Sequence, residues 1–136
     1  MAIATMMGAT PKQLETAKSR AIDLCRLAYA PQPVPQPDGT TLALCWSGRI
    51  ARAYDRLAIA RIAKDEPSIR KIETALTQLQ TSATVAFEAA ETAVRAWQTM
   101  AAAAGQTADV NAVYPPTCTC AACAAAAAYR SHHEFR

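Results

Sequence analysis

The feature of this sequence that most restricts its fold is a long series of apolar residues in its second half. Between Ile69 and Met100, apolar side chains recur alternately three and four positions apart. This spacing places them along one face of a single α-helix, in the pattern of a helical bundle or coiled coil. It predicts a long helix that begins at Asp65 or Ser68 and ends at Gly105, a residue typical of a left-handed helix cap. The residues on the predicted face are Ile69, Ile72, Leu76, Leu79, Ala83, Ala86, Ala90, Ala93, Trp97 and Met100.

Two shorter helices are expected before the long one. In Thr10-Pro11-Lys12-Gln13, threonine and glutamine form a capping box around a proline at the first helical position, and Pro31 ends this helix at Ala30. The second helix begins near Thr40 or else at Ser47, and it runs to about Lys64. Between the two helices, alternating prolines over residues 31–39 predict an extended polyproline connector.

The composition favours an all-α fold. Only 6% of the residues are aromatic and four are glycine, whereas sheets need β-branched and aromatic surfaces and frequent turn residues. The chain is therefore expected to form a bundle of three helices plus a short carboxy-terminal helix. In this interpretation residues 1–105 are the helical bundle domain, and residues 106–136 are an appended tail that contains cysteine and histidine.

The sequence contains none of the common catalytic motifs. It has no GxxxxGK[ST] phosphate loop, no GxGxxG, no GxSxG and no HExxH. The two histidines stand at 132 and 133, near the end of the chain, where neither is expected to act as a rigidly held general base. We therefore predict a protein that is not an enzyme. No signal peptide or membrane anchor is recognisable, which predicts a cytoplasmic protein without a membrane partner.

The five cysteines indicate a metal site more than a disulfide framework. An odd number of cysteines in a chain without an export signal favours thiols or metal ligands. Cys118, Cys120 and Cys123 with His132 have the ligand types of tetrahedral zinc, and His133 competes for the fourth position. The alternative is a flexible tail whose thiols are simply reduced. Cys25 and Cys45 have apolar neighbours and are interpreted as small core residues without a further role.

A basic helix face is the second candidate site. Half of the fourteen basic residues lie between positions 49 and 71, although the net charge is only +3. At 100° per residue, one side of the second helix carries a basic face of Arg49, Arg52, Arg56 and Lys64, opposite an apolar side. The planar fork of arginine suits phosphate or carboxylate recognition. An ordinary solvated surface is the alternative.

A helical bundle with this basic face and this long heptad helix resembles the small helical subunits of CRISPR effector ribonucleoprotein complexes. The resemblance covers roughly residues 10–105 and is architectural. It implies several copies packed against other protein subunits, with the basic face in contact with the backbone of RNA or DNA and catalysis carried out elsewhere.

A helical structural or adaptor protein is the competing interpretation. Such a protein would be a phage particle component or a regulatory partner. Its arginines would contact acidic protein, and zinc would stabilise its tail.

Residues 74–87 carry no charge, which predicts that even the back of the long helix contacts another surface.

Overall fold

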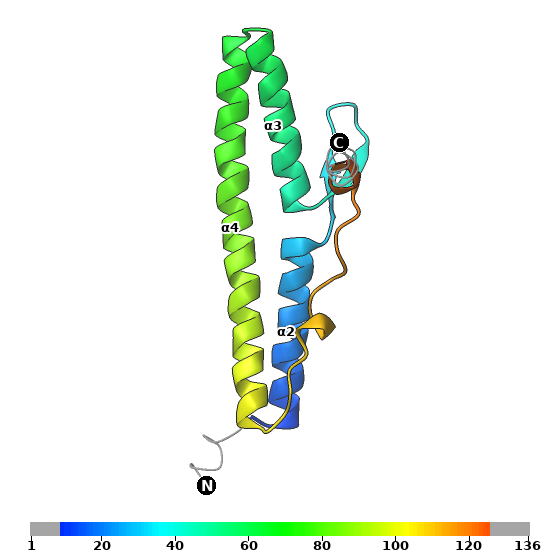
Figure 1. Cartoon of the computed structure of the whole chain (residues 1–136), viewed down its shortest axis with the longest axis vertical. Coiled ribbons are helices and arrows are strands. Elements are labelled where there is room, and N and C mark those ends of the chain that lie inside the picture. Colours follow the sequence, from blue (N-terminus) through cyan, green and yellow to red (C-terminus); the bar gives the residue numbers. More distant parts are fainter. Residues whose placement is uncertain (1–8, 126–136) are drawn as a thin grey trace, which may run out of the picture. The chain divides into compact units, whose positions relative to one another are not determined.

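The protein is predominantly helical, with one small sheet (Figure 1). The computed structural model describes residues 9–125. Residues 121–125, at the end of this range, are also helical. The prediction of a mainly helical chain is confirmed, but the all-α class is wrong because two strands pair. The elements in chain order are α2 (Pro11–Tyr29), β1 (Gln32–Pro35), β2 (Thr41–Leu44), α3 (Trp46–Ile62), α4 (Glu66–Ala103) and the 3₁₀-helix η1 (Val110–Ala112).

Helix α2 begins at the predicted capping box. The Gln13 backbone N–H donates to Thr10 Oγ1 at 3.1 Å, and the Thr10 N–H donates to Gln13 Oε1 at 2.9 Å. These two bonds satisfy donors that the first helical turn would otherwise leave unpaired. The helix ends at Tyr29, one residue before the predicted end.

The proline-rich segment is extended, as predicted, but it is one strand of a hairpin and not an unpaired polyproline connector. β1 and β2 are antiparallel, with Val34 opposite Leu42. The Gln36 N–H donates to the Thr40 carbonyl at 2.8 Å, so every second N–H before it also points toward β2. Pro33 and Pro35 fall on the alternate, exposed positions, where a missing N–H costs no ladder bond.

The hairpin turn depends on Asp38 and Gly39. The Gly39 N–H donates to the Gln36 carbonyl at 3.0 Å, and Gly39 has φ +86°, a left-handed conformation that glycine adopts without strain. The Asp38 carboxylate accepts from both the N–H and the hydroxyl of Thr40, at 3.0 and 2.6 Å. These contacts explain why the chain reverses here instead of continuing extended.

Helix α4 has the length that its heptads predict, and both its ends are capped. The Asp65 carboxylate accepts from the Ser68 N–H and hydroxyl, at 3.3 and 2.7 Å. At the other end Gly105 has φ +73°, and the Gln106 N–H donates to the Ala101 carbonyl at 2.8 Å, which is the bond of a Schellman cap. Over residues 9–125, none of the helices is both long and apolar enough to span a bilayer.

The described chain divides into two compact units. The first unit consists of residues 9–29 and 86–116, and the second of residues 30–85 and 117–125. Helix α4 contributes its two ends to different units. This division does not follow the predicted boundary after residue 105, because the cysteine-containing segment packs with residues 30–85. Packing of three helices in one bundle stays a prediction.

In the first unit, α2 packs against the carboxy-terminal part of α4. Tyr29 lies beside Phe87 and Tyr114, with ring centroids 5.3 and 5.5 Å apart. Cys25 is fully buried, which confirms its interpretation as a core residue. The buried residues of this core are Leu14, Ala21, Cys25, Ala28, Ala90, Ala93, Val94, Trp97, Ala101 and Val113.

In the second unit, α3 and the amino-terminal part of α4 form an antiparallel helical pair (Figure 1). Ala53, Leu57 and Leu76 are buried, and Ile50, Ile69, Ile72 and Leu79 pack around them. The Gln80 side-chain amide donates to the Tyr54 hydroxyl at 3.0 Å, and Arg61 forms an exposed salt bridge with Glu73 at 4.0 Å. The pairing of Arg61 agrees with its position near the apolar side of α3.

The back of the uncharged run in α4 is exposed within the described chain. Val85 is 62% exposed, and the hydroxyls of Thr74, Thr77, Thr81 and Thr84 donate to carbonyls four residues earlier in the same helix. These bonds within the helix satisfy the hydroxyls, so the surface needs neither charged side chains nor another protein segment to pair with them. The predicted contact of this surface is therefore not made by residues 9–125.

Replacing Leu76 by alanine is expected to destabilise the protein by about 2–5 kcal/mol, because Leu76 is 7% exposed and its removal leaves a cavity between α3 and α4. Val85→Ala in the same helix is the control, and its expected effect is within about 0.5 kcal/mol. Urea denaturation measures both variants. Equal stabilities for them would show that Leu76 is not part of the core.

Candidate functional site

Four cysteines from two distant segments meet in the second unit. They are Cys45, Cys118, Cys120 and Cys123, here called the four-cysteine cluster, and their Sγ atoms all lie within 4.8 Å of one another. Cys45 and Cys120 are buried, and the other two are half-buried. Four cysteine sulfurs are a donor set of structural zinc sites, so the cluster is a candidate metal centre.

The hairpin and α3 determine the position of Cys45. β2 ends at Leu44, and Cys45 has extended backbone angles as the N-cap of α3. Leu44 and Cys45 form a small core with Cys120, and Val34, Leu42 and Ala122 pack against it. This apolar packing holds the cysteine segment of residues 117–123 on the hairpin, and it brings the three other thiols to Cys45.

The sulfur separations fit tetrahedral metal coordination. Cys45 Sγ lies 3.4 Å from Cys123 Sγ and 3.9 Å from Cys120 Sγ. These distances are far longer than a disulfide bond of about 2.05 Å. A tetrahedral zinc ion with Zn–S bonds of about 2.3 Å requires sulfurs about 3.8 Å apart. The four cysteines therefore supply the donor set of a structural zinc site, and the two Cys45 separations are compatible with its spacing.

Backbone N–H groups point at two of the sulfurs. The Gly48 N–H donates to Cys45 Sγ at 3.3 Å, and the Cys120 N–H donates to Cys118 Sγ at 3.4 Å. Cys45 also stands at the amino terminus of α3, where the helix dipole favours negative charge. These groups place positive partial charge beside the sulfurs, and thiolate is the form of cysteine that binds metal.

The cysteines influence one another's protonation. Burial by itself raises the pKa of Cys120, but hydrogen bonds with Cys45, Cys123 and Cys118 outweigh it and lower this pKa to about 6. Burial, together with hydrogen bonding to Cys45 and Cys120, raises the pKa of Cys123, and burial also raises that of Cys118. The close approach of the sulfurs therefore shifts the pKa of Cys120 and that of Cys123 in opposite directions.

Gly48 makes room for the cluster. A Cβ atom at this position would lie 3.2 Å from both Ala122 Cβ and Cys120 Sγ, which is closer than normal van der Waals contact. Alanine in a helix normally stabilises relative to glycine by about 0.5–1 kcal/mol. Here we expect Gly48→Ala to destabilise instead, by about 1–3 kcal/mol, because the added methyl group pushes the cysteine segment away from α3. Thermal denaturation measures the sign, and a stabilised variant would contradict this packing.

A comparison with known protein families, curated proteins and solved structures finds no match for this chain. The candidate sites therefore have to be interpreted from their own geometry.

The structure brings together three of the four predicted metal ligands and adds one. Cys118, Cys120 and Cys123 lie in the cluster, whereas the predicted fourth ligand His132 and its competitor His133 lie outside the described residues. Cys45, interpreted from sequence as a core residue, is indeed 5% exposed, but the other three thiols surround it. Cys45 therefore joins the candidate ligands, a position that its apolar neighbours in the sequence did not indicate.

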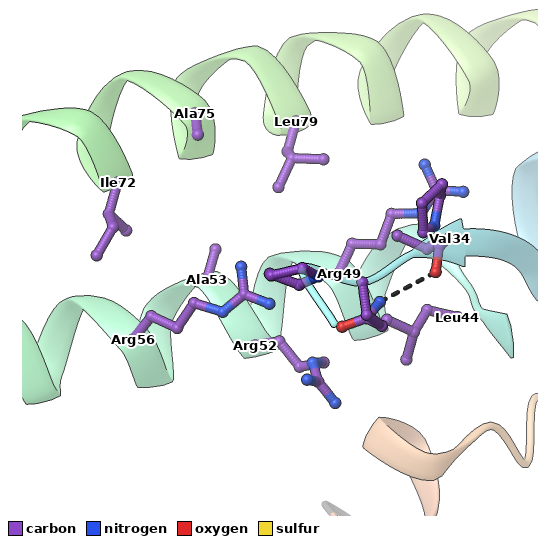
Figure 2. A pocket seen from close by; sticks show the side chains of 12 residues that line it. Val34, Leu44, Arg49, Arg52, Ala53, Arg56, Ile72, Ala75 and Leu79 are labelled. Carbon is purple, nitrogen blue, oxygen red and sulfur yellow. Dashed lines mark hydrogen bonds between the residues drawn. The ribbon is translucent and has the colours of Figure 1, made fainter. Parts of the chain in front are cut away.

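The predicted basic face lies beside a pocket. Arg49, Arg52 and Arg56 of α3 line a pocket of about 440 Å³, here called the arginine pocket, and Figure 2 shows Ile72 and Leu79 of α4 pointing toward α3 across it. The proline-rich end of the hairpin forms a further wall, where the Gln36 side-chain amide donates to the Val34 carbonyl at 3.0 Å (Figure 2). The twelve lining residues are Val34, Pro35, Gln36, Pro37, Leu44, Arg49, Arg52, Ala53, Arg56, Ile72, Ala75 and Leu79.

The positive charge of this pocket is not neutralised within the described chain. The guanidinium of Arg49 lies over the Trp46 ring, 4.5 Å from its centroid, and its buried Nε has no hydrogen-bond partner. Across residues 9–125, salt bridges with carboxylates form at Arg61 and Arg95 but not at the three pocket arginines. The pocket is therefore a concave cationic surface.

Lys64 is not part of the arginine pocket. Helix α3 ends at Ile62, and Lys64 follows in the turn before α4 with φ 55°, so helical periodicity no longer determines its direction. Lys64 is fifteen positions beyond Arg49, which corresponds to about 20 Å along a helix of this rise. The predicted four-residue basic face is therefore reduced to three arginines in one place.

Proposed function

We propose that this chain is a non-catalytic structural subunit whose second unit is held together by one zinc ion. The observation that carries this proposal is the approach of four thiol sulfurs within 4.8 Å of one another. Cys45, Cys118, Cys120 and Cys123 would each supply one thiolate. Four protein ligands complete the tetrahedron of zinc and leave no open position for a substrate, as in structural rather than catalytic sites.

The benefit of such a site follows from its connectivity. Cys45 and Cys120 are separated by 75 positions in the sequence, and a shared ion joins the cysteine segment to the hairpin and to the first turn of α3. The apolar core at this point is small, with Leu44, Cys45 and Cys120 as its buried members. A structural ion adds folding free energy where so little apolar surface is available.

Elemental analysis of the purified protein tests the proposal. We expect about one zinc per chain, because tetrahedral thiolate sites select zinc, copper(I) or iron. One equivalent of iron or copper would still support a metal site at these cysteines, but with a different metal. Protein expressed with supplemented zinc that contains no metal would leave four reduced thiols and overturn the proposal.

A second function is favoured by the arginine pocket. We propose that Arg49, Arg52 and Arg56 contact the backbone of RNA or DNA, with the chain serving as an assembly subunit of a nucleoprotein complex. The supporting observation is that three arginines from one helix side line one pocket and form no salt bridge with the described carboxylates. Arginine binds phosphate oxygens through two parallel hydrogen bonds.

This second function predicts binding without base recognition. Phosphate contacts fix position and carry no sequence information, and their strength falls steeply with salt because bound counterions are released. Electrophoretic mobility shifts at low salt, with oligonucleotides of unrelated sequence, test it. The exposed back of α4, which includes Val85, is a surface available to the protein neighbours that such an assembly requires.

A further inference from the structure

The walls of the arginine pocket differ sharply in chemistry. One side carries Arg49, Arg52 and Arg56, and the other sides are formed by prolines of the hairpin and by Ile72 and Leu79 of α4. We propose that this pocket binds a single nucleotide-sized phosphate ester, with its phosphate on the arginines and its nucleoside on the apolar walls. This inference rests on the proposed nucleic-acid function and deepens it, because the ligand is either a free nucleotide or the phosphorylated end of a strand.

The dimensions of the pocket favour one small ligand. Pockets of about 300–1,000 Å³ are typical of small-molecule sites, and about 440 Å³ lies within that range. A depression between a hairpin and two helices admits one group inserted from outside. Where the ligand is a strand end, its terminal phosphate would enter the pocket, and the following backbone phosphates would lie outside it, near the rim that the arginines form.

The charge of the pocket favours a terminal phosphate. A phosphate monoester carries about −1.5 to −2 charges at neutral pH, whereas each backbone phosphate carries one. Three arginines without a described carboxylate partner provide more positive charge than a single diester can neutralise. Arg49 is held in place by its stack on Trp46, at 4.5 Å, so less side-chain entropy is lost when it binds.

The apolar walls explain why a nucleoside should accompany the phosphate. Leu44, Ile72 and Leu79 line the pocket and offer nothing to inorganic phosphate. A neighbouring pocket of about 370 Å³ shares Arg49, Ala75 and Leu79 and is also lined by Trp46. Trp46 therefore lines a depression that adjoins the arginine pocket through Arg49, and a base can stack there.

Calorimetric titration with adenosine monophosphate, adenosine and inorganic phosphate tests the inference on the zinc-loaded full chain. We expect the nucleotide to bind at least tenfold more tightly than either of the other two probes. Arg52→Gln combined with Arg56→Gln should weaken nucleotide binding at least tenfold. Arg61→Gln is the matched control and should bind like the parent, because Arg61 pairs with Glu73 outside the pocket.

A second measurement separates the two sources of the phosphate. Single-stranded oligonucleotides with a 5′-phosphate, a 3′-phosphate or hydroxyl ends are compared at equal salt. Preference for one phosphorylated end, with competition by the free nucleotide, supports a strand end as the ligand, and binding of the nucleotide alone supports a free metabolite. Oligonucleotides that bind equally with or without a terminal phosphate would overturn this inference and leave the nucleic-acid function standing. Failure of every probe to bind would overturn both.

Discussion

Cys45→Ser is expected to abolish stoichiometric zinc binding and to make the second unit much less stable. Serine is nearly isosteric with cysteine but does not supply a thiolate, so only three ligands remain in the four-cysteine cluster. Structural zinc sites in small peptides contribute about 10–16 kcal/mol of apparent binding free energy. Losing even a third of that free energy, about 3–5 kcal/mol, exceeds the effect of most single substitutions.

Chelation distinguishes a lost ion from a lost side chain. A strong zinc chelator should lower the melting temperature of the parent protein and leave that of Cys45→Ser unchanged, since the variant holds no ion to remove. Cys25→Ser is the matched control, because Cys25 is also buried but lies in the core of the first unit. It should retain about one zinc per chain whatever its effect on stability. Equal chelator sensitivity of the parent and Cys45→Ser would contradict the proposed ligand.

The helices could be predicted from the sequence because local chemistry determines their ends. The Thr10 capping box, Asp65 before α4 and Gly105 after it act through hydrogen bonds within a few residues. The hairpin could not be predicted in this way. Prolines alternating over residues 31–37 indicate extended backbone, but whether a second strand pairs with it depends on Leu42 and Leu44, which pack against the cysteine segment far along the chain.

The metal centre shows the same limit. The compact spacing of Cys118, Cys120 and Cys123 indicated a site. Cys45 could not be recognised as a fourth ligand, because its neighbours in the sequence are apolar and it lies far from the other three cysteines along the chain. One signal was present: Cys45 follows a short apolar strand and stands at the N-cap of the next helix. Helical periodicity correctly predicted that Arg49, Arg52 and Arg56 share one side of α3. It could not place Lys64, because α3 ends at Ile62.

Changing Arg49, Arg52 and Arg56 together to glutamate is expected to abolish nucleic-acid binding while the helices remain. The substitution reverses six units of charge at one pocket, so phosphate is repelled where it was attracted. All three residues are partly or fully accessible, and the core of the second unit is formed by other side chains. Circular dichroism should therefore be nearly unchanged, although the stack of Arg49 on Trp46 is lost.

The salt dependence gives the strictest measure of this prediction. Each lost phosphate contact should reduce the slope of log binding constant against log salt by about 0.7–0.9 units. The reduction is therefore about 2–3 units if the arginines hold three separate backbone phosphates, and less than about 1 unit if they hold one terminal phosphate. Arg61→Glu together with Arg70→Glu is the control for a general change in charge, because Arg61 pairs with Glu73 and neither residue lines the arginine pocket. That variant should lose far less affinity than the pocket variant.

If the two variants weaken binding equally, the arginines act through overall charge alone. If the pocket variant binds as well as the parent protein, phosphate is not their ligand, and the structural role of the zinc-stabilised unit is the function that remains.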